Sequence, residues 1–439
     1  MLNRLFFQRI DNSPLIIFRI FFGILVALEC FGAIATGWVK RNLVEPKYTF
    51  PFIDFSWLEV FTGEGMYLYY FLMGILGISI ALGFKYRLSI IGFTLLWTGS
   101  YLMQKTAYNN HYYLLILISF LMCFFPAHKD YSLDVRMGFI KRGNSMYGYI
   151  KWTIVLQLFI VYTYASIAKL YGDWLDFGMI ELLMKSKSDY PLVGALLQEA
   201  WVHKIIGTCG ILFDLLVIPA LLWKPTRKWA FFASIFFHLF NSIIFQIGIF
   251  PYLSLAFSVF FFEPETIRKL FFKRKVPFQA QKTIVPNYKK TFLIGFCAYF
   301  LLQLILPIRH YFIKDDVLWT EEGHRMSWRM MLRDRRGTGQ FKVVRKNGSE
   351  IFVDIQTLLT KGQQRKVLAY PDFTWQFAQY LKRDLKEESE EISVYLIDSK
   401  VSINGRQPAP FIDPTIDLAN IPWSPLSHSD WILPSNLED

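Results

Sequence analysis

The stretch from Trp152 to Leu170, WTIVLQLFIVYTYASIAKL, decides the fold class. It is an apolar run of the length that crosses a bilayer as a helix, and it carries Lys169 near its end. A charged side chain at the centre of such a helix costs ~2.5–3.5 kcal/mol, so these residues are rare and usually functional. A desolvated lysine also loses its preference for the charged form and can then act as a base. Lys169 is therefore either a catalytic base or a lysine that reaches the membrane surface.

The composition places the whole chain in a membrane. Of 439 residues, 53% are hydrophobic and 18% aromatic, despite a formal charge of +12, whereas soluble domains contain about 45–50% apolar residues. Because no small-x-small cleavage site follows the first apolar run, we expect that run to remain as a helix. Nine runs are predicted to span the membrane, at about 14–34, 65–83, 88–104, 111–126, 150–170, 204–223, 229–247, 249–263 and 291–307. The fold class predicted for residues 1–307 is a mainly α polytopic membrane domain.

The remaining residues, 308–439, are polar and mixed. Asn347-Gly348 and Asn404-Gly405 follow short apolar segments, and this dipeptide is a strong signal for a β-hairpin. Phe373 to Leu385 has the periodicity of one amphipathic helix. We expect a mostly β soluble domain after the membrane domain.

The basic residues of the loops predict the orientation. In a nine-span topology they all fall on one side, which the positive-inside rule makes cytoplasmic together with the N-terminus. An odd number of spans then places the C-terminal domain outside, in periplasm or lumen. That domain is nearly neutral, which argues against nucleic-acid binding. The basic loop residues are Arg4, Arg9, Lys85, Arg87, Arg136, Lys141, Arg142, Lys224, Arg227, Lys228, Arg268, Lys269, Lys273, Arg274 and Lys275.

The cysteines and histidines indicate neither a disulfide framework nor a metal site. Cys30, Cys123, Cys209 and Cys297 all fall in predicted spans, so the exoplasmic domain contains none. The seven histidines show no zinc-ligand spacing, and no glycine-rich phosphate loop or nucleophile elbow is present.

Polar side chains from distant spans gather at one predicted depth. At 1.5 Å rise per residue, Lys169 lies ~27 Å above Lys151, near the outer surface of the membrane. Lys105 and the tract around Asn109, Asn110 and His111 are expected at a similar height. His238 and Asn241 share one face of the seventh span. An amine, imidazoles and amides at this depth suit a lipophilic substrate with a polar head, such as a quinol.

Each of these signals also has an ordinary structural explanation. His238 on an apolar helix is more often a hydrogen-bonded core histidine than a catalyst. Asn109 or Asn110 can cap the fourth span, because asparagine is a preferred N-cap. The aromatic residues nearby can form an interfacial belt. Their convergence favours a pocket, because anchoring alone does not require it.

These same residues resemble one family, the vitamin K-dependent γ-glutamyl carboxylases, and in particular short bacterial relatives with an HTTM domain. The similarity runs in order from about residue 13 to 434. The matching tracts are Lys105–Leu114 (family "KTxxNNHxYL"), Phe159–Tyr162 followed by Ala168–Trp174, Asn241–Ser242 with Ile247–Tyr252 (family "NSQ…IGMFPY"), Trp319–Thr320, Ser327–Met331, Val401–Asn404, Ile412–Pro414 and Trp423–Pro425.

The resemblance implies an enzyme that uses reduced vitamin K (phylloquinol or menaquinol), oxygen and carbon dioxide, without a metal. The quinol is epoxidised, and a strongly basic oxygen intermediate removes a γ-proton from a glutamyl residue of a peptide, which is then carboxylated. Lys169 and His111 would be catalytic, with Lys169 as the base. The expected quinol-binding residues are Asn109, Asn110, His238, Asn241, Lys105 and Tyr162. The expected acceptor-binding residues are Trp319, Ser327, Trp328, Arg333 and Arg335. Replacement of Lys169 by alanine is expected to leave the fold intact.

This chain departs from the vertebrate members at three points. Ala168 stands where they have a second lysine, and Thr415 stands where they have an arginine that could hold a carboxylate. Their luminal portion is also longer. The resemblance therefore supports quinol epoxidation more strongly than carboxylation.

Two other functional classes remain open. A transporter or lipid-binding protein would also use outer-leaflet polar residues and a broken span such as that at Gly248–Pro251. It would bind quinone or another lipid without catalysis. A membrane scaffold would use its spans only as an anchor.

Overall fold

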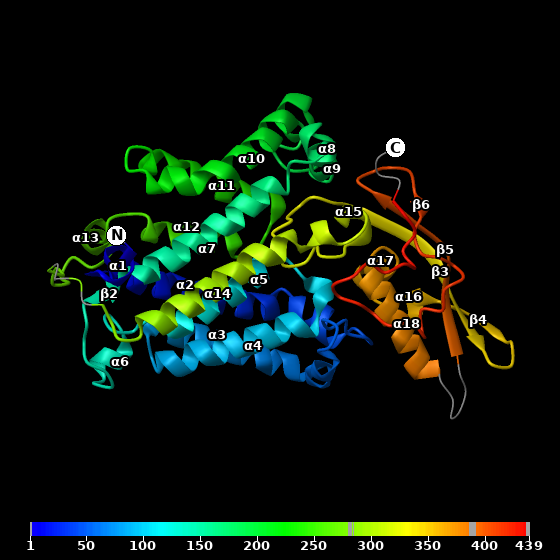
Figure 1. The fold of residues 1–439 in the computed structure, drawn as a ribbon, viewed down its shortest axis with the longest axis horizontal. Helices are drawn as coiled ribbons and strands as arrows, with labels where there is room; N and C mark the ends of the chain where they lie inside the picture. Colours follow the sequence, from blue (N-terminus) through cyan, green and yellow to red (C-terminus); the bar gives the residue numbers. More distant parts are fainter. Residues whose placement is uncertain (1, 280–282, 284, 386–391, 436–439) are drawn as a thin grey trace.

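The computed structural model describes residues 2–279, 283, 285–385 and 392–435. Figure 1 shows a bundle of long helices with a β-sheet at one end. The N-terminus, α6 (Leu133–Arg136) and α13 (Pro264–Phe271) lie at the opposite end of the bundle. The predicted order, a mainly α membrane part followed by a part with β-strands, is confirmed.

The membrane part consists of helices joined by short connections. A two-stranded pairing of β1 with β2 ties the N-terminal segment to the start of α7. The elements are α1 (Leu2–Phe7), β1 (Arg9–Asp11), α2 (Ser13–Ala35), α3 (Gly65–Leu82), α4 (Tyr86–Met103), α5 (Asn110–Phe124), β2 (Ser145–Tyr147), α7 (Gly148–Ile167), α8 (Gly172–Leu175), α9 (Gly178–Lys185), α10 (Ala200–Leu222), α11 (Arg227–Phe245), α12 (Phe250–Phe257) and α14 (Lys289–Ile308).

Each of the nine predicted spans overlaps one long or apolar helix of this set. Within the described residues, α2, α3, α7, α10, α11 and α14 are long and apolar enough to cross a membrane. α5 and the segment from α12 onward are shorter apolar helices. The remaining predicted span corresponds to α4, a helix of 18 residues. The membrane character of this part therefore follows from the sequence pattern, while the number of helices that cross fully is approximate.

Helices α2 and α3 pack closely because glycines lie at their crossing. A Cβ atom at Gly23 would lie 2.3 Å from the backbone nitrogen of Ala81, and one at Gly77 would lie 2.8 Å from that of Ala27. Without a hydrophobic driving force between helices in lipid, close backbone approach through small residues supplies the packing energy. This crossing fixes α2, which contributes one wall of the site described below.

Two buried cations fasten the bundle end that lies away from the sheet. Arg19 of α2 donates to the carbonyls of Ala127 (3.1 Å) and Tyr131 (2.6 Å). Lys275, one of the predicted cytoplasmic loop residues, is only 2% exposed, and its Nζ lies 2.5 Å from Asp11 Oδ1. Buried charges need such partners because desolvation is costly.

The C-terminal part is a four-stranded antiparallel sheet in the order β4-β3-β5-β6, covered by helices. Asn347-Gly348 lies in the β3–β4 turn and Asn404-Gly405 in the β5–β6 connection, so both predicted hairpins are confirmed. The predicted amphipathic helix is α18, whose Phe377 packs against Phe341 of the sheet with ring centroids 5.0 Å apart. The elements are α15 (Val317–Thr320), β3 (Arg335–Arg345), β4 (Glu350–Val353), α16 (Ile355–Leu358), α17 (Lys361–Val367), α18 (Pro371–Leu385), β5 (Ile392–Ile403) and β6 (Ala409–Pro410).

The first prediction concerns topology. Cysteines introduced at Lys273, just after α13, and at Ser427, in the C-terminal part, both at exposed positions, should be accessible from opposite sides of the membrane. The basic loops place Lys273 in the cytoplasm, so a membrane-impermeant thiol reagent should label only Ser427→Cys in intact cells. Labelling of Lys273→Cys after lysis serves as the control. Labelling of Lys273→Cys from outside would contradict the predicted orientation.

Candidate functional site

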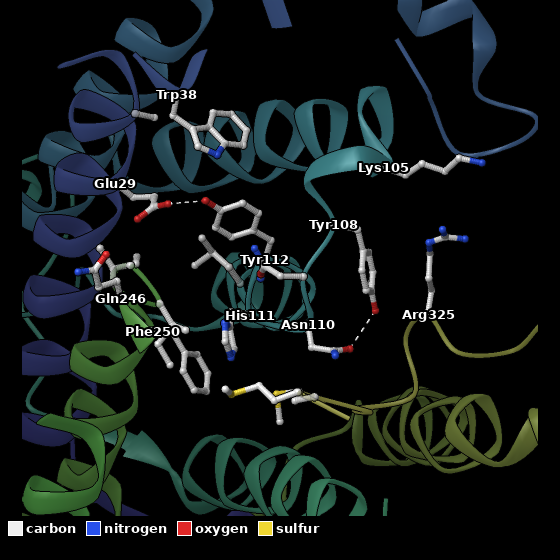
Figure 2. Close-up of a pocket in the computed structure, with 18 of the residues that line it drawn as sticks. Glu29, Trp38, Lys105, Tyr108, Asn110, His111, Tyr112, Gln246, Phe250 and Arg325 are labelled. Atoms are coloured by element: carbon white, nitrogen blue, oxygen red, sulfur yellow. Dashed lines mark hydrogen bonds between the residues drawn. The ribbon is translucent and has the colours of Figure 1, made fainter. Parts of the chain in front are cut away.

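A cavity of about 740 Å³ lies where the membrane helices meet the C-terminal part. Its size is that of a pocket for a small organic ligand. One wall comes from α2 and the α11–α12 connection, the centre from the start of α5, and the other wall from the loop before β3 and from α17–α18. Figure 2 shows Glu29 and Gln246 at one end and Lys105 and Arg325 at the other, with His111 and Asn110 between them.

The α4–α5 turn builds the centre of the cavity. The Asn109 side chain caps α5 by accepting a 2.7 Å hydrogen bond from the Tyr112 backbone N–H, which is the usual role of asparagine at a helix start. The Asn110 side chain accepts from the Tyr108 hydroxyl (2.9 Å) and donates to the Arg329 carbonyl (3.1 Å). Both amides are thus committed to protein partners, and they turn His111 toward the cavity (Figure 2).

The loop before β3 forms the cavity wall in a strained conformation. Met326, Trp328 and Met331 all have positive φ values, of 60°, 57° and 58°. Such conformations cost about 1–3 kcal/mol each and persist only when the surroundings enforce them. One enforcing contact is the 2.7 Å hydrogen bond from the Met326 backbone N–H to the Tyr108 hydroxyl. The α4–α5 turn therefore holds this loop in place.

This strained loop makes one end of the cavity strongly basic. His324 is 1% exposed and stays neutral, because burial first and the neighbouring arginines second hold its pKa well below the usual value. Its Nε2 lies 2.5 Å from a guanidinium nitrogen of Arg333. The cationic side chains that line the cavity are Lys105, Arg325, Arg329, Arg333 and Lys366. An acid with a delocalised negative charge fits this end.

Asp372 of α18 joins the two parts of the chain at this basic end. Its Oδ2 lies 2.5 Å from Lys105 Nζ and 2.8 Å from Arg325 Nη1, and all three groups are largely buried. The two cations hold the pKa of Asp372 well below its usual value despite burial. Burial lowers the pKa of Lys105 to about 8, and Asp372 only partly offsets this.

His111 is the best-placed imidazole in the cavity. Its ring stacks on Phe250 with centroids 3.9 Å apart, and neither ring nitrogen has a hydrogen-bond partner among the described residues. His238 lies behind Phe250, with ring centroids 6.3 Å apart, and is bonded to the Tyr162 hydroxyl over 3.1 Å. His238, Tyr162 and Asn241 therefore lie outside the cavity lining, unlike His111.

Lys169 also lies outside the lining of this cavity, just beyond the end of α7. It is 7% exposed, and its Nζ forms an ion pair with Asp214 of α10 and a 3.2 Å hydrogen bond to the Ala165 carbonyl. This pairing argues against the expectation that Lys169 can be removed without harm to the fold, because its loss would leave a buried carboxylate unpaired.

Most of the predicted acceptor-binding residues do not line the cavity and are instead bonded to, or packed against, other parts of the protein. Trp319 is 1% exposed and donates to the Leu433 carbonyl over 2.7 Å. Ser327 Oγ donates to the Gly323 carbonyl over 2.5 Å. Trp328 stacks on Tyr113, and Arg335 donates to three backbone carbonyls, including that of Ala369 at 2.9 Å. Of this group, Arg333 alone is among the residues that line the cavity.

Several residues of the site were not predicted from the sequence. Arg325 and Asp372 gave no signal, because only the fold brings them to the cavity. Arg329 lies within the matching tract Ser327–Met331, but no role was assigned to it. Glu29 gave the same signal as Lys169, a charge within an apolar run. Asp214 lies inside the sixth predicted span and could have been found in the same way.

Two comparisons with known families agree with this architecture. Residues 7–265 match the family model of the HTTM domain, and residues 288–438 match that of the vitamin K-dependent gamma-carboxylase lumenal domain. The chain is an HTTM-domain member of the vitamin K-dependent gamma-carboxylase family. No solved structure matches it. As a member of this family with several apolar helices, it is a multi-pass membrane protein with a lumenal-type C-terminal domain.

The second prediction tests the Lys169–Asp214 pair. Lys169→Ala or Asp214→Ala alone should lower the free energy of unfolding by ~3–5 kcal/mol, because each leaves one uncompensated buried charge. The double variant Lys169→Met/Asp214→Leu should be close to wild type, since both charges leave together. Thermal unfolding in detergent measures all three. Single variants as stable as wild type would mean that the pair is solvated.

The third prediction concerns pH. The depressed folded-state pKa of Asp372 means that its stabilising contribution is present above the ordinary value of 3.8 and is lost as the pH falls below it. Asp372→Asn should therefore destabilise the protein at pH 7 and reduce the loss of stability between about pH 4 and pH 3. Unfolding midpoints across this range measure it, with Asp430→Asn, an exposed carboxylate of the same C-terminal part, as control. An equal acid response in wild type and Asp372→Asn would contradict it.

Proposed function

We propose that this protein is a vitamin K quinol-dependent, carboxylase-like membrane enzyme that catalyses oxygen-dependent quinol epoxidation. γ-Carboxylation of a glutamyl side chain is the coupled reaction that the family relationship suggests. The chain would work as two domains, 1–307 and 308–439, with the N-terminus in the cytoplasm and the reaction taking place between the domains.

The observation that carries this proposal is the two-ended cavity. Its membrane end offers aromatic and apolar surface, with Phe250 against His111 and Trp38 near Tyr112, and suits a naphthoquinol ring. Its other end offers arginines, which suit the carboxylate of an acceptor peptide. A quinol and a glutamyl side chain could therefore meet near His111.

The residues present fit reduced vitamin K. The His111 nitrogens have no hydrogen-bond partner among the described residues, and the flat Phe250 ring lies against the imidazole. When bound, this quinol supplies, with oxygen, the oxidative chemistry that drives proton removal from the acceptor. Met330 and Met331 line the same space and help to exclude water from it.

The roles of the remaining residues follow from their placement. Arg325, Arg329 and Arg333 would hold the acceptor carboxylate at the basic end. Lys169 is proposed as the base that deprotonates the quinol, and Asp214 is the acceptor to which its proton can move. Because Lys169 lies outside the cavity lining, this role requires a rearrangement that brings the amine to the quinol.

Thr415 stands at the position of the family's arginine, but its surroundings are structural. Its backbone N–H and hydroxyl both contact Asp413 Oδ1, at 2.9 and 2.6 Å, and neither residue lines the cavity. The basic end of the cavity therefore relies on its own arginines for any acceptor acid.

One observation favours a second candidate, a quinone- or lipid-binding protein without catalysis. The proposed base is engaged in a buried ion pair outside the cavity, and a binding protein needs no base. Epoxide formation separates the two candidates.

The fourth prediction is that epoxidation and carboxylation separate in this protein. Purified protein given reduced menaquinone and oxygen should form the epoxide, measured by mass. A vertebrate-type glutamyl peptide should incorporate little or no labelled carbon dioxide. Thr415 stands in place of the family's arginine, and Arg325 and Arg333 of the cavity already pair with Asp372 and Glu321. The folded double variant Lys169→Met/Asp214→Leu should form no epoxide, because the proposed base is absent.

Two arginines provide a matched control for the acceptor end. Arg333 lines the cavity and pairs with Glu321, whereas Arg336 is exposed and pairs with Asp334. Arg333→Gln should weaken binding of the glutamyl peptide by roughly tenfold, as expected for loss of one charge-assisted hydrogen bond, and Arg336→Gln should not. Quinone binding without any epoxide would support the non-catalytic candidate instead.

A further inference from the structure

Glu29 is the feature of the cavity that the proposed roles leave unused. It lies in the outer half of α2, inside the first membrane span. Among the described residues that line the cavity it is the only acidic one. A carboxylate at this depth is costly, and intramembrane ionisable residues usually face a cavity because they have a function there.

The contacts of Glu29 leave it able to accept further hydrogen bonds. The Tyr112 hydroxyl donates to its Oε1 over 2.7 Å (Figure 2), and the backbone of Ile249 offers a second donor. A carboxylate has about four lone-pair sites, so roughly two remain. Glu29 has no ion pair in the part of the chain that the structure describes.

The α11–α12 connection keeps this carboxylate open to the cavity. Gly248 has a φ of +62°, and a Cβ there would lie 3.5 Å from Glu29 Oε2. Glycine adopts this left-handed conformation without strain, and even a Cβ there would make only ordinary contact with the acid. Gln246 and Ile249 flank this point and line the same cavity.

The chemistry of a quinol makes such an acceptor selective. A reduced quinol carries two hydroxyl donors, whereas the oxidised quinone carries only carbonyl acceptors. The charged side chains elsewhere in the cavity are cations, which donate and cannot accept. A carboxylate therefore accepts a hydrogen bond from a hydroxyl of the reduced form. Against the oxidised form or the epoxide, the carboxylate oxygen and the ligand carbonyl are both acceptors, and their contact is unfavourable.

We propose that Glu29 accepts a hydrogen bond from one hydroxyl of the bound quinol and so selects the reduced cofactor over its oxidised form. This inference rests on the proposed quinol-dependent function. Glu29 is a positioning residue in this scheme, because it holds the quinol ring beside His111. It also favours release of the oxidised product. The selectivity expected from one hydrogen bond to a charged group is roughly 10- to 100-fold in Kd.

The test compares the two redox forms of one ligand on the full-length protein. Dissociation constants for menaquinone-4 and for its reduced quinol are measured without oxygen, so that no turnover occurs. Wild type should bind the quinol roughly 10- to 100-fold more tightly than the quinone. Glu29→Gln should lose most of this preference, because an amide presents a donor to the ligand. Glu29→Asp should restore part of it.

Glu59→Gln is the matched control. Glu59 also accepts a 2.7 Å hydrogen bond from a tyrosine hydroxyl, that of Tyr380, but it does not line the cavity. Its replacement should leave the preference for quinol unchanged. The midpoint potential of the bound quinone gives an independent readout, and it should fall in Glu29→Gln because the reduced form is stabilised less.

The outcomes separate the two proposals. Wild type that binds neither redox form would overturn the quinol-dependent function itself. Wild type that binds both forms equally, or a Glu29→Gln variant that keeps the full preference, would overturn the role of Glu29 while the quinol-dependent function stands.

Discussion

The position of the cavity depends on one buried carboxylate, that of Asp372. It forms ion pairs with two cations from different parts of the chain, Lys105 from the α4–α5 turn and Arg325 from the strained loop. Three largely desolvated charges are stable only together, because removal of one leaves another uncompensated. The geometry of this cluster therefore determines where α18 sits relative to the membrane helices, and with it the shape of the basic end of the cavity.

The hydrogen bonds of Tyr108 and Asn110 extend this control along the cavity wall. They hold the backbone of Met326 and Arg329, within a loop that contains several residues with positive φ. The strain of that loop is thus compensated by contacts from a turn at the membrane surface. As a result, the arginines of the C-terminal part and the imidazole of the membrane part have fixed relative positions, which two loosely joined domains could not provide.

Local secondary structure was predicted from the sequence more accurately than the contacts between residues that are distant in the chain. The apolar runs, the two Asn-Gly hairpins and the amphipathic α18 follow from periodicity and turn chemistry, which act over a few residues. The tract from Lys105 to His111 was also recognised as one unit, and the structure places it in the cavity. The pairings of Lys169 with Asp214 and of Lys105 with Asp372 join residues far apart in the chain, so no spacing could reveal them. The predicted depth could not reveal the lining either, because His238 and Lys169, expected at a similar height to His111, lie outside the lining of the cavity.

The buried charges of the membrane helices show why Glu29 differs from the rest. Arg19 is compensated by two backbone carbonyls, and Lys169 and Asp214 compensate each other. These charges belong to the fold, because their partners are part of it. In the described chain, Glu29 has hydrogen-bond donors but no cation, and it faces a cavity instead of a packed helix. The negative charge of Glu29 is therefore only partly compensated by the protein. A ligand that enters the cavity with a hydroxyl group can donate the further hydrogen bond that the protein does not provide.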